Sequence, residues 1–134
     1  MSDDRFASAL ALRKEGKYAE AGALFHALWQ ETGTAGTASG YLHCLRKTGH
    51  AAAAVAIGKQ ALEKFPQDVW IRRELVWAVY DADVKPAVEK EDLPQLTRAA
   101  EAIVELQPED MPLRLTVFAI AKLAKAKGQW QIVS

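Results

Sequence analysis

Hydrophobic residues recur at three- and four-residue steps along most of the chain, which is the spacing of amphipathic helices. The first such stretch ends near Glu15, and the second runs from Tyr18 to Thr32. Gly16 separates the two stretches and Gly33 follows the second, and glycine readily adopts the left-handed backbone that ends many helices. The pattern therefore predicts two antiparallel helices of about fourteen residues joined by a tight turn.

The same plan is repeated between residues 34 and 66, with one helix, a turn centred on glycine, a second helix and a terminal proline. Gly49 corresponds to Gly16 and Ala54 corresponds to Ala21, with the same separation in both pairs. This separation is close to the period of about 34 residues, with two helices per unit, that is typical of tetratricopeptide (TPR) repeats. The spacing indicates a helical repeat protein.

The residues at these positions also resemble those of the TPR family. In that family a glycine is followed two residues later by an aromatic residue, then by a small residue and a second aromatic residue. The first unit carries this pattern at Gly16, Tyr18, Ala21 and Phe25. The second unit keeps the glycine, the small residues and the final Pro66, but has Ala51 and Gly58 in place of the aromatic residues.

The third unit begins at Asp68, a good helix cap, and it is longer than the others. The stretch from Pro66 to Pro108 exceeds one repeat by about eight residues. We therefore expect an insertion near residues 82–91 that lengthens the turn between two helices. Asp92 then offers a cap for the next helix, with Gln95 placed to complete a capping box.

The fourth unit begins at Asp110, and the Gly128 turn that should precede its second helix is followed by only a few residues. The last repeat is thus incomplete, and we expect the chain to be the N-terminal part of a longer protein. The uncovered helix would be a surface for homodimer formation.

The resemblance implies an all-α fold: a right-handed α-solenoid of antiparallel helix pairs, with about three and a half repeats and the insertion in the third. Residues 1–134 would form a single repeat domain. Its repeats would span residues 2–33, 34–67, 68–109 and 110–134.

In the TPR family the first helix of each repeat lines a concave face, and six positions of that helix point inward. The inward positions in this chain would be Asp3, Phe6, Ala7, Leu10, Arg13, Lys14, Gly36, Ser39, Gly40, His43, Arg46, Lys47, Trp70, Arg73, Glu74, Trp77, Tyr80 and Asp81. From these, the residues expected to contact a partner are Phe6, Leu10, Arg13, His43, Arg46, Lys47, Trp70, Arg73, Trp77 and Tyr80.

Structural roles for the same residues remain open alternatives. Trp70 and Trp77 lie seven positions apart, hence on one helix face, and a tryptophan there can belong to the core. Arg13 and Arg46 are near helix ends, where cations complement the helix dipole. His43 can be a structural or solvated residue.

Composition and charge narrow the classes of partner and the cellular compartment that we expect. The formal net charge is zero, whereas binders of nucleic acid usually carry a basic excess. Cys44 is the only cysteine, which excludes an internal disulfide and fits a reducing compartment. Because the sequence shows no signal peptide or membrane span, we expect a cytoplasmic protein.

Sequence motifs of catalysis are absent: there is no phosphate-binding loop, no metal-binding His-Glu-x-x-His and no nucleophile elbow. His26, His43 and His50 belong to different helices or turns, without carboxylates at the spacing of metal ligands. We therefore expect no enzymatic activity, no cofactor and no metal.

The function favoured by the sequence is a protein-interaction scaffold that holds an acidic or aromatic partner segment in the concave groove. The chaperone-binding members of the family hold a C-terminal carboxylate with lysine and asparagine side chains, but the corresponding positions here cannot supply those donors. These positions are Phe6, Leu10, Gly40, Trp70 and Glu74. The alternatives are an RNA-binding helical repeat and a self-association module.

Overall fold

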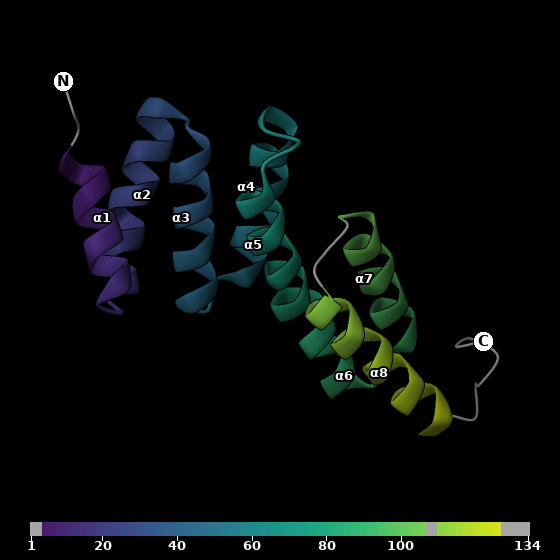
Figure 1. Ribbon diagram of the computed structural model, residues 1–134. Helices are drawn as coiled ribbons and strands as arrows, with labels where there is room; N and C mark the ends of the chain where they lie inside the picture. The colour runs from purple at the N-terminus through teal and green to yellow at the C-terminus, as the bar shows by residue number, and fades with distance from the viewer. Residues whose placement is uncertain (1–3, 107–109, 127–134) are drawn as a thin grey trace. The chain divides into compact units, whose positions relative to one another are not determined.

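Every regular element in the described part of the chain is a helix, which confirms the all-α class (Figure 1). The computed structural model describes residues 4–106 and 110–126, and for residues 110–113 it describes the backbone alone. The elements are α1 (Asp4–Lys14), α2 (Tyr18–Thr32), α3 (Ala35–Lys47), α4 (Ala51–Lys64), α5 (Val69–Val79), the π-helical η1 (Tyr80–Val84), α6 (Lys85–Lys90), α7 (Leu93–Glu105) and α8 (Asp110–Ala126).

The chain divides into two compact units, residues 1–78 and 79–134. The division falls within the segment predicted to be the third repeat. The arrangement of all four segments as one solenoid of antiparallel pairs stays a prediction.

The predicted glycine turns of the first unit are confirmed, and two of them have the same geometry. Gly16 and Gly49 have φ values of 82° and 83°, in the left-handed region that glycine adopts without steric cost. After Gly16, the Lys17 amide donates to the Leu12 carbonyl at 2.9 Å, and after Gly49 the His50 amide donates to the Leu45 carbonyl at 2.8 Å. The α1–α2 and α3–α4 connections are therefore equivalent turns one sequence period apart.

Small residues allow close helix packing in the first unit, where α1 packs on α2, α2 on α3 and α3 on α4. Ala21 and Ala54, which correspond in the two sequence repeats, are both fully buried. Gly40 of α3 faces the buried Phe25 of α2 so closely that an added Cβ atom would lie 2.5 Å from the phenyl ring. Helix packing therefore dictates glycine at this position, even though alanine has the higher helix propensity.

The first part of α5 completes the core of this unit. The Asp68 carboxylate accepts the Ile71 amide at 2.8 Å, as expected for its predicted role as a helix cap. Ile71 is fully buried together with Leu42 of α3 and Ala61 of α4. Burial of one face of α5 leaves its other face on the surface of the unit.

The second unit corrects the prediction of a long turn around residues 82–91. These residues instead form the end of η1 and then α6, and Glu91, which follows α6, has a left-handed φ of 55°. The extra length of the third unit predicted a lengthened turn, but Val84 and Ala87 are buried. Pro86 is accommodated in the first turn of α6, where its missing amide proton costs little.

In the same unit, α7 and α8 pack together. Asp92 caps α7 as predicted, accepting the Gln95 amide at 3.0 Å. The predicted capping box is wrong, because the Gln95 side chain donates to the Asp83 carbonyl instead. The Gly128 turn and the incomplete end of the last repeat lie outside the described residues.

Two glycines of α3 provide a matched test of the close packing against α2. A Cβ atom at Gly36 would lie 3.3 Å from the Phe6 ring, compared with 2.5 Å from Phe25 at Gly40. Both Gly→Ala changes gain about 0.8–1 kcal/mol of helix propensity. We expect Gly40→Ala to be less stable than Gly36→Ala by about 1–3 kcal/mol, because overpacking strains a buried core. Urea unfolding measures both, and equal stabilities would contradict the packing described.

Candidate functional site

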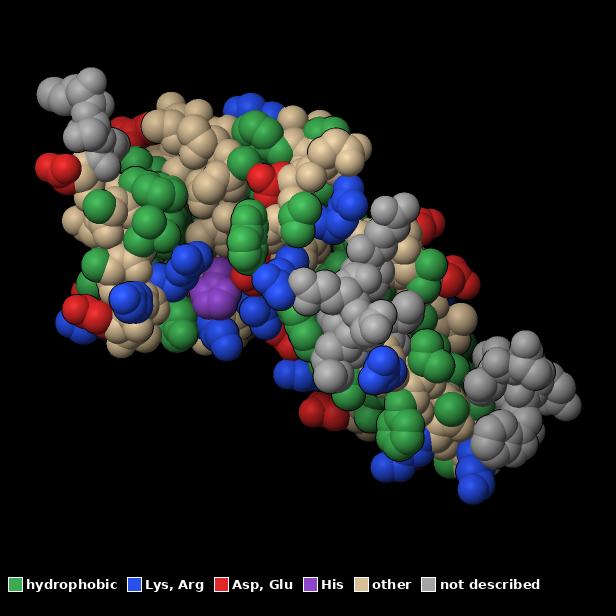
Figure 2. All heavy atoms as spheres, viewed as in Figure 1, with side chains coloured by type: hydrophobic (Ala, Val, Ile, Leu, Met, Phe, Trp, Pro, Cys, Tyr) green, Lys and Arg blue, Asp and Glu red, His purple; other side chains and the backbone are tan. Residues whose placement is uncertain are grey.

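The surface of the first unit contains a concavity of about 580 Å³ formed by α1, α3 and α5. Figure 2 shows hydrophobic side chains and Lys and Arg side chains around a histidine on this face. The lining residues are Phe6, Leu10, Arg13, Gly36, Ser39, His43, Arg46, Trp70, Arg73, Glu74 and Trp77. All of them occupy positions that the TPR resemblance places on the inward side.

Eight of the ten residues predicted to contact a partner line this concavity. Lys47 is exposed but is not among the lining residues, and Tyr80 belongs to η1 in the other unit. Gly36, Ser39 and Glu74 line the concavity although they were not predicted as contacts. The register of inward positions already contained all three, and could have identified them. The binding role of the set stays a prediction.

The depth of the concavity comes from small residues on α3, the helix between α1 and α5 in the lining. Gly36 has no side chain, and a Cβ atom there would meet the Phe6 ring. Ser39 is half-buried, and its hydroxyl donates to the Gly36 carbonyl at 3.2 Å. Larger side chains at these positions would fill the space.

Aromatic residues of α5 form one side of the concavity. Trp70 is 61% exposed, so the alternative that it belongs to the core is wrong. The Arg73 guanidinium lies 5.4 Å from the centroid of the Trp70 ring. Trp77 is half-buried, with the Arg46 guanidinium 6.0 Å from its ring centroid. Both distances are within the range of cation–π attraction.

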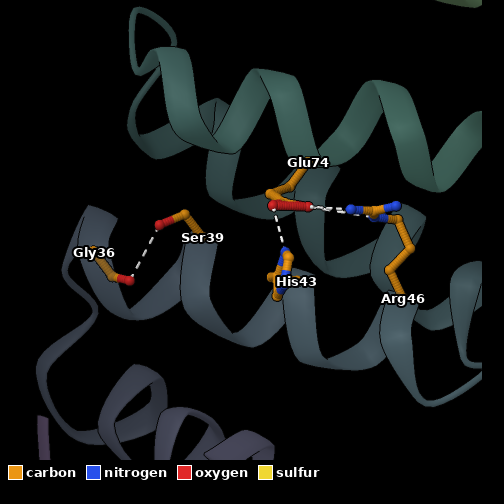
Figure 3. Close-up of polar contacts among 5 residues, drawn as sticks. All are labelled: Gly36, Ser39, His43, Arg46 and Glu74. Carbon is orange, nitrogen blue, oxygen red and sulfur yellow. Dashed lines mark hydrogen bonds and ion pairs between the residues drawn. The ribbon is translucent and has the colours of Figure 1, made fainter. Parts of the chain in front are cut away.

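A cluster of charged side chains links α3 and α5 inside the concavity (Figure 3). One oxygen of the Glu74 carboxylate lies 2.9 Å from Nδ1 of His43. The other oxygen accepts from Nε and Nη2 of Arg46 at 3.3 and 3.2 Å. The Glu74 side chain is only 14% exposed, so the cluster is largely shielded from water.

The pKa of Glu74 reflects this environment. Burial by itself raises the pKa, but the hydrogen bond and charge of His43, followed by those of Arg46, outweigh burial, and the net shift is downward. Glu74 is therefore ionised at neutral pH and can only accept hydrogen bonds. In the neutral form of His43 the proton must consequently reside on Nδ1, leaving Nε2 as an acceptor.

Arg46 was predicted to contact a partner, but its guanidinium already pairs with the Glu74 carboxylate of its own chain. Arg13 differs: it is half-buried, and among the described residues no carboxylate lies at ion-pair distance from it. Its guanidinium lies 5.9 Å from the centroid of the Phe25 ring. With Arg73, the lining carries three arginines and the single carboxylate of Glu74.

A second concavity of about 300 Å³ is lined by α2, α3 and the turn that follows α3. His26 stacks on Tyr41 there, with ring centroids 4.8 Å apart, and Cys44 is buried at this place. Burial raises the pKa of the Cys44 thiol to about 11, although the Arg13 charge lowers it. A thiol of that pKa is a poor nucleophile at neutral pH.

Within residues 4–106 and 114–126, no group of three or more His, Cys, Asp or Glu side chains could hold a metal ion. His50 forms a hydrogen bond with a neighbouring side chain, since its Nδ1 lies 2.9 Å from the Thr48 hydroxyl. In the described helices, none is both long and apolar enough to cross a membrane.

Comparison with protein-family models, curated proteins and solved structures found no match to this chain. The resemblance to the TPR family therefore stays a prediction from the repeat spacing and the residues that carry it.

The Glu74 cluster predicts a stability difference that depends on pH. Glu74→Gln keeps the side-chain shape but removes the charge, so we expect a loss of about 1–3 kcal/mol at neutral pH. A carboxylate whose pKa is lowered on folding stabilises the protein above its ordinary pKa, and this contribution is lost as pH falls through the folded value. The difference between variant and wild type should therefore shrink below pH 4.5, the ordinary value for the carboxyl group.

Urea unfolding at neutral pH and at about pH 3 measures this difference. Glu63→Gln on α4 is a matched control, because Glu63 is exposed, and we expect it to change stability by less than about 0.5 kcal/mol at both pH values. A deficit for Glu74→Gln that is the same at both pH values would contradict the ionised cluster.

Proposed function

We propose that the first unit is a protein-interaction module that holds a segment of a partner protein in the concavity of α1, α3 and α5. The observation that carries the proposal is the convergence of exposed aromatic, apolar and cationic side chains from three helices on one hollow. Tryptophan and arginine are the residues that most often dominate binding energy at protein interfaces.

The exposed apolar surface of this face supports a protein ligand. Leu10 is 37% exposed and Trp70 is 61% exposed, and both line the concavity. Exposed apolar side chains gathered around a hollow release water when a partner covers them, which is the main favourable term in association. A partner segment that inserts apolar side chains would gain this energy.

The equivalent turns at Gly16 and Gly49 support a TPR-like architecture, with antiparallel helix pairs stacked in a right-handed solenoid. In such an architecture α1, α3 and α5 are the first helices of successive repeats and share the concave side. The same three helices line the concavity. The proposed architecture explains why the lining comes from every second helix, α1, α3 and α5, and not from α2 and α4.

Single-stranded RNA is the less favoured ligand. Aromatic residues and arginines can stack on bases, but binding to RNA relies on many phosphate contacts. Arg46 is already paired with Glu74, and the whole chain has a net charge of zero. A protein segment requires no such excess of positive charge.

The proposal predicts that filling the concavity prevents binding. A library of random peptides displayed on phage, selected against the whole chain, supplies ligands for the measurement. Ser39→Phe adds a ring to the hollow, and Trp70→Ala removes the most exposed aromatic contact in it. We expect each change to weaken the selected peptides at least about tenfold, equivalent to about 1.4 kcal/mol.

Phe118→Ala is the matched control, because Phe118 is 69% exposed and lies on α8 of the other unit. It should leave peptide affinity unchanged in titration calorimetry, while circular dichroism verifies that all variants remain helical. Peptides that bind wild type and both concavity variants equally would rule out the concavity as the binding site.

A further inference from the structure

Arg13 is a cation that the fold places in the concavity without a carboxylate partner among the described residues. Arg46, in the same hollow, shows the contrasting situation, since Glu74 neutralises it. Removing a guanidinium from water has an energetic cost, and pairing with a well-placed anion offsets part of that cost. Half-burial of Arg13 therefore points to a negative group that arrives with the ligand.

Complementing the dipole of α1 does not by itself explain an arginine at this position. Lys14 follows directly in the same last turn of α1, is exposed, and supplies a cation to the same helix end. Arg13 differs from Lys14 in lining the concavity and in lying 5.9 Å from the Phe25 ring centroid. Contact with a buried ring restricts the guanidinium, so less side-chain entropy is lost when it binds a ligand.

The α1 face next to Arg13 is apolar. Phe6, Leu10 and Arg13 are spaced by four and three positions, hence on one side of the helix, and all three line the concavity. A helix rises about 1.5 Å per residue, so Arg13 lies about 4.5 Å beyond Leu10 and about 10 Å beyond Phe6 along the axis. An extended peptide advances about 3.3 Å per residue, which places an apolar side chain one to three residues from a group bound by Arg13.

We propose that Arg13 binds the side-chain carboxylate of an Asp or Glu in the partner segment, while an apolar side chain within three residues of it packs on Leu10 and Phe6. A carboxylate fits because the planar guanidinium can donate two parallel hydrogen bonds to it. The inference rests on the proposed function, and it names the chemical class of segment that the concavity selects.

A free C-terminal carboxylate is the other source of the same group. Capture of a chain terminus requires several donors converging on one carboxylate. On the α1 side, the neighbours of Arg13 in the lining are the apolar Phe6 and Leu10. A single guanidinium beside apolar surface instead suits a side chain that projects from a continuing segment.

The test uses peptides from the random library that bind the wild-type chain, synthesised with acetylated and amidated ends so that only side chains carry charge. Each peptide is also made with its acidic residue changed to the amide, Asp to Asn or Glu to Gln. Arg13→Met removes the charge while keeping an apolar stem of similar length over Phe25. Lys14→Met changes the net charge equally and is the matched control.

We expect Arg13→Met to weaken the acidic peptides about tenfold and Lys14→Met to weaken them less than about twofold, because truncating one member of a shielded charge pair is costly. The amide peptides should bind wild type about as weakly as the acidic peptides bind Arg13→Met. In the Arg13→Met variant, the change from acid to amide should have no further effect. Arg13→Lys, which keeps the charge, should weaken binding less than Arg13→Met.

Equal effects of Arg13→Met and Lys14→Met would overturn the inference, as would an acid-to-amide loss that persists in Arg13→Met. Binding that disappears when the peptide C-terminus is amidated would show recognition of a chain terminus and would also overturn it. In each case, continued sensitivity to Ser39→Phe would leave the proposed function standing. Insensitivity to Ser39→Phe would overturn the proposed function itself.

Discussion

The ion cluster of Glu74 with His43 and Arg46 is the interaction on which the concave face depends. It connects α5 to α3 through three hydrogen bonds of 2.9 to 3.3 Å, in a place where water has little access. Glu74 thereby neutralises the charge of Arg46 within the concavity. The same contacts hold the Arg46 guanidinium over the ring of Trp77. The Glu74 cluster therefore positions an aromatic side chain of the concavity as well as a charged one.

Small residues of α3 leave space that larger side chains would fill. Gly40 faces the core and lets α3 approach Phe25, whereas Gly36, one turn earlier on α3, and Ser39 line the concavity and leave it open. The small residues of α3 therefore allow close packing on α2 and also leave space for the hollow. They explain how three short helices can form a concavity within so small a unit.

The sequence predicted much of this arrangement because helix periodicity and glycine turns are local signals. Equivalent turns at Gly16 and Gly49 determine which residues begin each helix, and the register of inward positions follows from them. What the sequence did not reveal depends on contacts between distant residues: the pairing of Glu74 with Arg46 joins residues 28 positions apart. The prediction of a lengthened turn at residues 82–91 was wrong for a similar reason, since burial of Val84 and Ala87 within their unit favours a helix.

The central claim is that the face formed by α1, α3 and α5 binds a partner segment. Nuclear magnetic resonance of the isotope-labelled chain, titrated with an acidic peptide selected from the random library, tests it most directly. The account predicts that the largest shifts occur at the amides of lining residues such as Leu10, His43 and Arg73. Shifts concentrated around Tyr18, His26 and Tyr41 of the second concavity, or in residues 79–126, would contradict it.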